Sequence, residues 1–329
     1  MILKKQRKST ENMSASAPEK KVRKLSVGKK IRLGILAFIA VYLIAALLSL
    51  IANGHINTAV YSEKTDKING SVRVVLISDL HRTKFGADNE QLVERTAEQH
   101  PDIIAVDGDM LERDYTQDEL DDLVGLFERL VRIAPVYFSV GNHDYCAFFK
   151  VIDQLGGDYL CGIEKNEALI RLENTGAVFL ENEYRDIEVN GQKIRIGGFY
   201  GHAMQMEYDL QDGGASWARR KAFLQEFCGT DSYKLMLSHR PESFVRRSTE
   251  ADWDIDLILC GHTHNGVLSL PFGLGAIWGS EGLFPKHDRG EFKIGTRSTM
   301  IITAGLAGWR SIPRVFNPPE IAVIDILGK

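Results

Sequence analysis

The sequence contains few cysteines, and none of them is spaced for a common metal or redox motif. Only four cysteines occur among 329 residues, and no two of them form a C-x-x-C pair. Neither a zinc ribbon nor a thioredoxin-type redox site is therefore indicated. Cys260 lies inside an apolar run, and we interpret it as a small core residue. A Cys146–Cys161 disulfide would need an oxidising compartment, and we favour free cysteines at both positions.

Several catalytic and binding signatures are also missing. The absence of a G-x-S-x-G elbow disfavours a serine hydrolase, and the absence of G-x-x-x-x-G-K-[ST] disfavours a P-loop enzyme. Positive charge is scarce outside the N-terminus: residues 1–32 carry eleven Lys and Arg against two acidic residues, a net +9, so the other 297 residues carry −13. Because nucleic-acid binding needs Lys and Arg to displace counterions, we expect no nucleic-acid partner.

One stretch has no charged residue at all. Leu33–Ala52 reads LGILAFIAVYLIAALLSLIA, and twenty helical residues at about 1.5 Å each span a hydrocarbon core of about 30 Å. The alternatives are a buried core helix and a cleaved signal peptide, whose apolar region usually has about 7–15 residues and an A-x-A-like end. We favour an uncleaved anchor, because the run is longer, has no clean A-x-A site and follows a basic tail without a twin-arginine pair.

The charges that flank this run predict its orientation. Eleven Lys and Arg precede it, whereas Asn53–Asn69 contains only Lys64 and Lys67. The positive-inside rule then places the N-terminus in the cytoplasm and the rest of the chain outside it, on a single-pass protein of the cell membrane. The predicted organisation is a basic cytoplasmic tail (1–32), a transmembrane helix (33–53), a polar tether (54–70) and one α/β domain with two mixed sheets (71–329).

Polar residues follow the apolar runs of this domain. Strands are expected at Val72–Ser78, 102–106, 135–140, 194–198, 234–237 and 257–259, with antiparallel strands near 293–294, 300–302 and 321–326, and helices at 89–99 and 118–133. The motifs SDLH, DGDM, GNHD, SHRP and GHTH each come directly after a predicted strand. Singly, such residues are often helix caps or turn residues. Together they would converge at the carboxyl edge of the sheets, where carboxylate, imidazole and amide ligands suit a pair of divalent metals.

The series D-x-H, G-D, G-N-H-D, H and G-H-T-H resembles the calcineurin-like metallophosphoesterase superfamily, over about Val72 to Leu327. The C-terminal stretches FPKHDRGEFKIG, ITAGLAG and PRVFNPPEIAVIDI resemble its membrane-associated bacterial branch, which includes the YkuE- and YaeI-type phosphoesterases. The resemblance implies that the two mixed β-sheets pack as a sandwich flanked by helices, preceded here by one transmembrane helix.

The resemblance also implies roles for individual residues. The first metal ion would be held by Asp79, His81 and His264, and the second by Asn142, His239 and His262. Asp109 would bridge the two ions, which would be Mn, Fe or Zn, and His143 would be the catalytic histidine. A hydroxide between the metals would attack phosphorus in line, while His143 stabilises the phosphoryl oxygen or protonates the leaving oxygen.

Two departures from the branch pattern leave the choice of substrate open. The branch continues G-H-T-H with G-G-Q, whereas this chain has Asn265, Gly266 and Val267, and Arg82 and Lys84 follow the first motif as candidate substrate-binding residues.

The apolar loop Ser269–Pro285 follows the predicted site, and we expect it to pack locally rather than against lipid. We therefore expect a membrane-anchored phosphoesterase for a phosphomonoester or phosphodiester, with a lipid or envelope component as one candidate substrate. The alternative is a non-catalytic metal-binding or sensing protein that retains the fold. Because no predicted ligand is missing and His143 is present, the enzyme is favoured.

Overall fold

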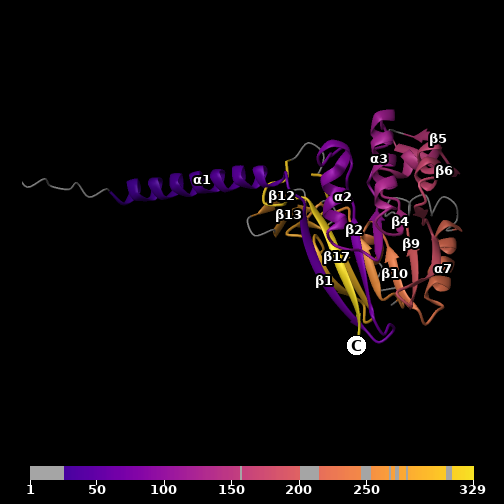
Figure 1. Ribbon diagram of the computed structural model, residues 1–329. Helices are drawn as coiled ribbons and strands as arrows, with labels where there is room; N and C mark the ends of the chain where they lie inside the picture. The colour runs from indigo at the N-terminus through magenta and orange to yellow at the C-terminus, as the bar shows by residue number, and fades with distance from the viewer. Residues whose placement is uncertain are drawn as a thin grey trace, which may run out of the picture. The chain divides into compact units, whose positions relative to one another are not determined.

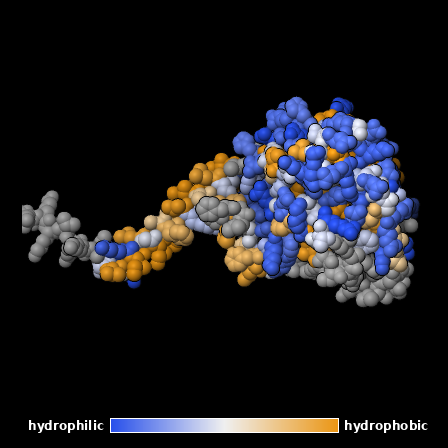
Figure 2. Space-filling view, turned by 90° about the horizontal axis from the view of Figure 1, so that it is seen from below, coloured by the Kyte–Doolittle hydropathy of each residue, from blue (hydrophilic) through white to orange (hydrophobic). Residues whose placement is uncertain are grey.

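A computed structural model describes residues 26–155, 158–200, 215–245, 253–266, 268–270, 274–278, 281–308 and 313–329. The chain divides into two units, Met1–Ala45 and Ala46–Lys329. Helix α1 (Val27–Ala52) contains the predicted apolar run and begins six residues before it. It is long and apolar enough to cross a membrane, and apolar side chains extend along it (Figure 2). The greater part of the predicted basic tail, residues 1–25, lies outside the described residues.

The first sheet has six strands in the order β1-β17-β2-β3-β4-β7. Strands β2, β3, β4 and β7 run parallel, β17 is antiparallel to β2, and β1 is parallel to β17. Their bounds are Asn57–Thr65 (β1), Ser71–Ile77 (β2), Ile103–Asp107 (β3), Val136–Ser139 (β4), Val178–Phe179 (β7) and Glu320–Gly328 (β17). The prediction of a polar tether over residues 54–70 is therefore wrong for most of its length. The physical reason is that residues 57–65 pair with the last strand of the chain, which satisfies their backbone groups at the sheet edge.

The second sheet also has six strands, in the order β15-β16-β11-β10-β9-β8. Strands β9, β10, β11 and β16 run parallel, and β8 and β15 are antiparallel strands at the two edges. Their bounds are Glu183–Val189 (β8), Gln192–Gly198 (β9), Tyr233–Leu237 (β10), Leu257–Cys260 (β11), Gly290–Ile294 (β15) and Ser298–Ile302 (β16). Both sheets are thus mixed, as predicted.

The two sheets face each other, with helices on their outer faces (Figure 1). Because strand side chains alternate between faces, Val74 and Leu76 of β2 pack against Leu235 and Leu237 of β10 in the core between the sheets. The opposite face of the first sheet packs against α2 (Glu90–Ala97), α3 (Gln117–Leu130) and α5 (Glu167–Glu173), and that of the second against α7 (Ala215–Cys228). The α/β sandwich fold is confirmed.

Smaller elements connect these layers, and the sequence did not predict them. They are η1 (Ala87–Asn89), α4 (Tyr145–Phe148), β5 (Phe149–Leu155), β6 (Asp158–Lys165), α8 (Glu242–Val245), β12 (Leu268–Leu270), β13 (Leu274–Trp278) and β14 (Gly282–Leu283). Cys228 and Cys260 are free, but Cys146 is disulfide-bonded, contrary to our expectation of a free thiol there. A short helix and a hairpin follow the GNHD motif, and this local structure could not be read from the spacing of two isolated cysteines. The side chain of Cys161 lies outside the described residues.

Candidate functional site

The predicted polar motifs lie where the parallel strands end. Strands β2, β3 and β4 of the first sheet end at Ile77, Asp107 and Ser139, and the predicted residues follow within a few positions. Strands β10 and β11 of the second sheet end in the same way, at Leu237 and Cys260. Backbone hydrogen bonds join the turns to one another, since Asp79 and His81 donate to the carbonyls of Gly108 and Asp109. The five motifs therefore meet at one edge.

The first group that this arrangement forms consists of Asp79, His81 and His264, whose potential ligand atoms all lie within 4.8 Å of one another. His264 Nε2 is 3.6 Å from Asp79 Oδ1, and the rings of His81 and His264 stack with centroids 5.4 Å apart. Asp79 and His81 follow a strand of the first sheet, whereas His264 follows a strand of the second. This is the set predicted to hold the first ion.

Asp109, His239 and His262 form a second group with the same spacing. Asp109 Oδ2 lies 3.1 Å from His239 Nε2 and 3.9 Å from His81 Nε2, a nitrogen of the first group. One carboxylate oxygen thus lies between the two groups. That position is the one a bridging carboxylate needs, because paired metal ions lie about 3.5–4 Å apart.

Asn142 is the remaining predicted ligand. Its Oδ1 is buried and has no hydrogen-bond partner among the described residues. Buried side-chain oxygens are rarely left without a donor or a cation. An amide oxygen in this state fits the neighbourhood of a divalent ion.

Three of the histidines are held in a fixed orientation by their outer nitrogen. Nδ1 of His239 lies 2.7 Å from the carbonyl oxygen of Asp107, and Nδ1 of His264 lies 3.0 Å from that of Ala307. A carbonyl can only accept, so Nδ1 carries a proton in both rings, and Nε2 keeps its lone pair when the ring is neutral. His81 Nδ1 meets a carboxylate instead, that of Glu112, at 2.8 Å. These contacts are the ones that orient metal-binding imidazoles.

Glu112, which we did not predict from the sequence, also contacts His143. Its Oε2 lies 2.9 Å from His143 Nδ1, so one carboxylate holds two histidines. This hydrogen bond, together with Asp109, raises the pKa of His143 to about 9 despite its burial. His143 is therefore a cation at neutral pH. A carboxylate three residues after Asp109, in DGDMLERD, is the signal that could have identified Glu112.

The backbone is strained at this edge. Five predicted site residues have positive φ, where residues other than glycine are uncommon: Asp79 (58°), His81 (48°), Asp109 (53°), His262 (70°) and His264 (50°). Each such position costs on the order of 1–3 kcal/mol and persists only where the surrounding structure enforces it. Strain of this kind concentrates at functional sites, which supports a functional role for this edge.

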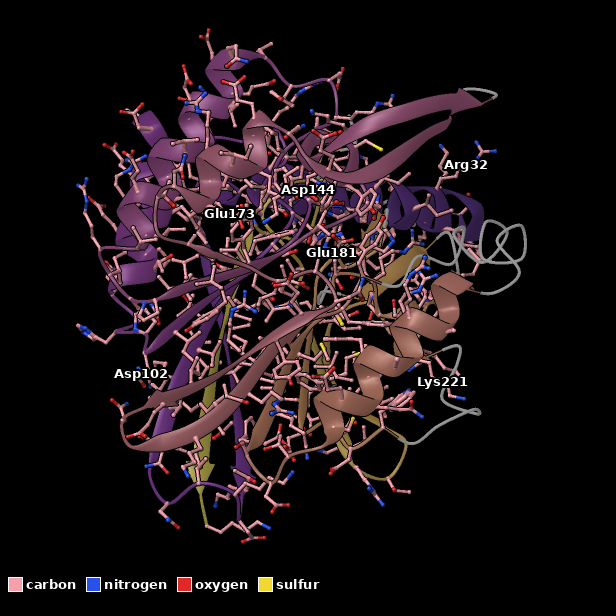
Figure 3. The ribbon with its side chains drawn as sticks, turned by 90° about the vertical axis from the view of Figure 1, so that its right-hand side faces the viewer. Arg32, Asp102, Asp144, Glu173, Glu181 and Lys221 are labelled. Atoms are coloured by element: carbon pink, nitrogen blue, oxygen red, sulfur yellow. The ribbon has the colours of Figure 1, made fainter. Side chains whose placement is uncertain are left out.

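Gly108 and Asp144 allow the second and third motifs to approach each other. A Cβ on Gly108, whose φ is +73°, would lie 2.5 Å from the backbone nitrogen of Gly141, so only glycine fits. Asp144, labelled in Figure 3, is fully buried, and it accepts hydrogen bonds from the backbone N–H of Gly141 and of Met110, at 2.6 and 2.9 Å. Its carboxylate therefore joins the two turns that carry Asp109 and Asn142.

Burial and mutual interaction determine the charge of the site. Burial opposes ionisation of Asp109, but His239, His81 and His143 hold its pKa well below the usual range. Burial lowers the pKa of His264 to about 4 and that of His262 well below its ordinary value. Both imidazoles are thus neutral at pH 7, the form that binds a metal ion.

The candidate substrate-binding residues form ion pairs. Arg82 Nη2 lies 2.6 Å from Asp114 Oδ1 and its Nε lies 3.0 Å from Glu119 Oε1, while Lys84 pairs with Asp122. They therefore attach the turn after the first motif to acidic residues of α3 and the segment before it.

Among the residues that depart from the branch pattern, Asn265 is buried, with its Nδ2 3.3 Å from Asn317 Oδ1. Val267 lies outside the described residues.

Comparison with known proteins gives one family. The family model for calcineurin-like phosphoesterases matches residues 72–266, more than half of the chain. This range includes every predicted ligand and His143. Among solved structures, the crystal structure of TT1561 of Thermus thermophilus aligns over 71% of this chain and 90% of that chain, with a TM-score of 0.41 and 13% identity.

Three of the relatives are metallophosphoesterases, or carry such a domain, by name. A Caenorhabditis elegans protein, named a metallophosphoesterase by inference, is 32% identical to this chain over 61% of this chain and 38% of its own length. A transmembrane protein with a metallophosphoesterase domain from Danio rerio is 26% identical over 79% of this chain and 54% of its own. An uncharacterized metallophosphoesterase of Aquifex aeolicus is 25% identical over 82% of this chain and 91% of its own. The chain thus spans less than two thirds of the first two relatives.

Proposed function

Because the chain belongs to the calcineurin-like phosphoesterase family, we propose that it hydrolyses phosphoric esters at the edge where its five motifs meet. The two groups of potential ligands would each hold one divalent ion, Mn, Fe or Zn, with Asp109 shared between them. The observation that carries this proposal is the position of Asp109 Oδ2 between His81 Nε2 and His239 Nε2.

The residues present fit such a pair of ions. The histidines that are held through Nδ1 direct Nε2 inwards, where the neutral ring offers a lone pair, and Asn142 adds a buried oxygen that has no donor among the described residues. Imidazole, carboxylate and amide oxygen are the donors that borderline divalent metals prefer. When bound, two such ions would lower the pKa of a water molecule and neutralise charge on the phosphoryl oxygens.

His143 would act as the catalytic residue of this site. Glu112 keeps it protonated at neutral pH and fixes the orientation of its ring through Nδ1. Nε2 of His143 can then donate a hydrogen bond to a phosphoryl oxygen or a proton to the leaving oxygen of a monoester or diester. Because Glu112 also holds His81, it would keep the catalytic histidine in register with the first group.

We propose further that the protein is a membrane-anchored member of the family, similar to the YkuE- and YaeI-type branch. Helix α1 supports an anchor, as does the name of the Danio rerio relative. By the positive-inside rule the domain would lie outside the cytoplasm, and the disulfide at Cys146 is consistent with an oxidising compartment.

A lipid or envelope phosphoester is the substrate that this location favours. We expected the loop Ser269–Pro285 to pack locally. This expectation is wrong for two of its residues, because Leu283 and Phe284 are 70% and 67% exposed. Leu283 is the last residue of the two-residue strand β14, and Phe284 follows it directly. An exposed apolar pair of this kind suits contact with a lipid surface. Residues 271–273 and 279–280 of the loop lie outside the described residues.

The test is a substrate screen with the full-length chain in detergent, because truncation at residue 71 would remove strand β1. Metal-free protein is loaded with Mn²⁺, Fe²⁺ or Zn²⁺ and offered a chromogenic monoester, a chromogenic diester and phospholipid vesicles. We expect metal-dependent turnover that is lost in Asp109→Ala. A protein that binds two ions but turns over none of these esters would favour the alternative, a metal-binding or sensing protein that retains the fold.

A further inference from the structure

Glu242, at the start of α8, is a buried carboxylate that has no role in the reaction proposed above. Its side chain is 8% exposed, and neither of its carboxylate oxygens has a hydrogen-bond donor among the described residues. A buried carboxylate is costly unless a donor or a cation compensates it. The groups that lie close to Glu242 are therefore candidates for its partner.

Two side chains of the described residues face Glu242. Its Oε1 lies 3.9 Å from Nε2 of His262 and 3.8 Å from Nη2 of Arg240. Neither distance is a hydrogen bond, but about 1 Å of side-chain movement would form one. Arg240 supplies positive charge beside the carboxylate, and His262 supplies a ring nitrogen that can donate a hydrogen bond to it.

The geometry of His262 differs from that of the other site histidines. His81, His239 and His264 each meet an oxygen through Nδ1 and direct Nε2 into the site. In His262 the carboxylate of Glu242 faces Nε2 instead. A neutral imidazole that binds a metal through one nitrogen donates its proton through the other. A carboxylate on the Nε2 side therefore leaves Nδ1 for the metal.

We propose that Glu242 is the positioning residue of His262: it accepts the Nε2–H of this ring and so directs Nδ1 towards Asp109 and His239. This inference rests on the proposed function, because it assigns an outer partner to one ligand of the second ion. Glu242 would then play for the second group the part that Glu112 plays for His81 in the first.

The experiment measures metal affinity rather than activity. Metal-free, full-length protein in detergent is titrated with Mn²⁺ by calorimetry, in two backgrounds that each retain one group of ligands. His81→Ala leaves the group of His239 and His262, and His239→Ala leaves the group of Asp79 and His264. Adding Glu242→Ala should weaken Mn²⁺ binding roughly 10- to 100-fold in the first background and leave it unchanged in the second.

Two further variants control this comparison. Glu242→Gln keeps the shape and one acceptor oxygen, so it should recover part of the affinity, and it decides the question if Glu242→Ala does not fold. Glu281→Gln removes a carboxylate that likewise bonds a histidine, His287, at 2.7 Å but outside the ligand groups, and should change nothing.

Equal Mn²⁺ affinity with and without Glu242 in the His81→Ala background, or an equal loss in both backgrounds, would overturn this inference but leave the proposed function standing. A wild-type chain that binds no pair of ions would overturn it together with the proposed function.

Discussion

Replacing Glu112 by glutamine tests how this site controls the charge of His143. In the wild type, the hydrogen bond from His143 Nδ1 to Glu112 is the largest of the influences that raise the pKa of His143 to about 9. Glu112→Gln keeps the size of the side chain and removes its charge. The pKa of His143 should then fall towards the ordinary value of 6.5. A catalytic acid whose pKa is raised is active below that pKa, and its contribution is lost as the pH rises through it.

The size of the effect follows from the two pKa values. At pH 8, about nine tenths of His143 is protonated if its pKa is about 9, but only about 3% if it is 6.5, a loss of roughly 30-fold. At pH 6 both proteins hold the proton in most molecules, so the loss should be less than about twofold. Bound metal ions would lower the pKa of His143 in both proteins, so the prediction concerns the difference between them.

The assay is the pH dependence of kcat between pH 5.5 and 9.5 with saturating Mn²⁺. The falling limb of Glu112→Gln should lie about 2.5 pH units below that of the wild type. Because Glu112 also bonds His81 Nδ1, the metal content of the variant is measured in the same buffers. A uniform loss of kcat at every pH, with both ions bound, would refute the claim that Glu112 sets the ionisation of His143.

Four substitutions test separate parts of the proposed site, and one protease experiment tests its location. Asp109→Ala should release or scramble both ions in metal analysis, because its oxygen lies between the two groups; a variant that still binds two ions tightly contradicts the bridge. His143→Ala should keep its metal but lose roughly 10²–10⁴ in kcat, whereas Asn142→Ala should lose metal affinity; equal metal loss in both would remove His143 from catalysis. Gly108→Ala should lower the thermal midpoint and empty the site, since its Cβ would lie 2.5 Å from the backbone nitrogen of Gly141. Protease added to intact cells or protoplasts should digest the domain and spare the segment before α1; a protected domain would reverse the orientation.

The convergence of the site could be predicted from the sequence because, within each sheet, it depends on strand direction. Each motif follows a run of β-branched and aliphatic residues, and parallel strands place their carboxyl ends at one edge. Asp79 and Asp109 therefore come together at the edge of the first sheet, and His239 of the second sheet meets them, with its Nε2 3.8 Å from Asp79 Oδ1 and 3.1 Å from Asp109 Oδ2. Only the end of each strand matters, and the change from apolar to polar residues marks that end.

Pairings between distant segments could not be predicted in this way. Strand β1 pairs with β17, about 260 residues further along the chain, and residues 57–65 resemble a polar linker because only one edge and one face are covered. Glu112 and Asp144 escaped prediction for a related reason. Their function is to accept hydrogen bonds from other turns, and the type of residue does not reveal where its hydrogen bonds go.

The pair His262 and His264 shows where side-chain direction requires the structure. In an extended strand, residues i and i+2 point to the same side, so two histidines in this spacing would face one ion together. Here the turn gives both residues positive φ, 70° and 50°. His262 consequently joins Asp109 and His239, while His264 joins Asp79 and His81. The left-handed backbone thus allows a single turn to serve both groups, and its strain must be offset by the hydrogen bonds that hold it, among them the two from the His262 N–H to the carboxylate of Asp79.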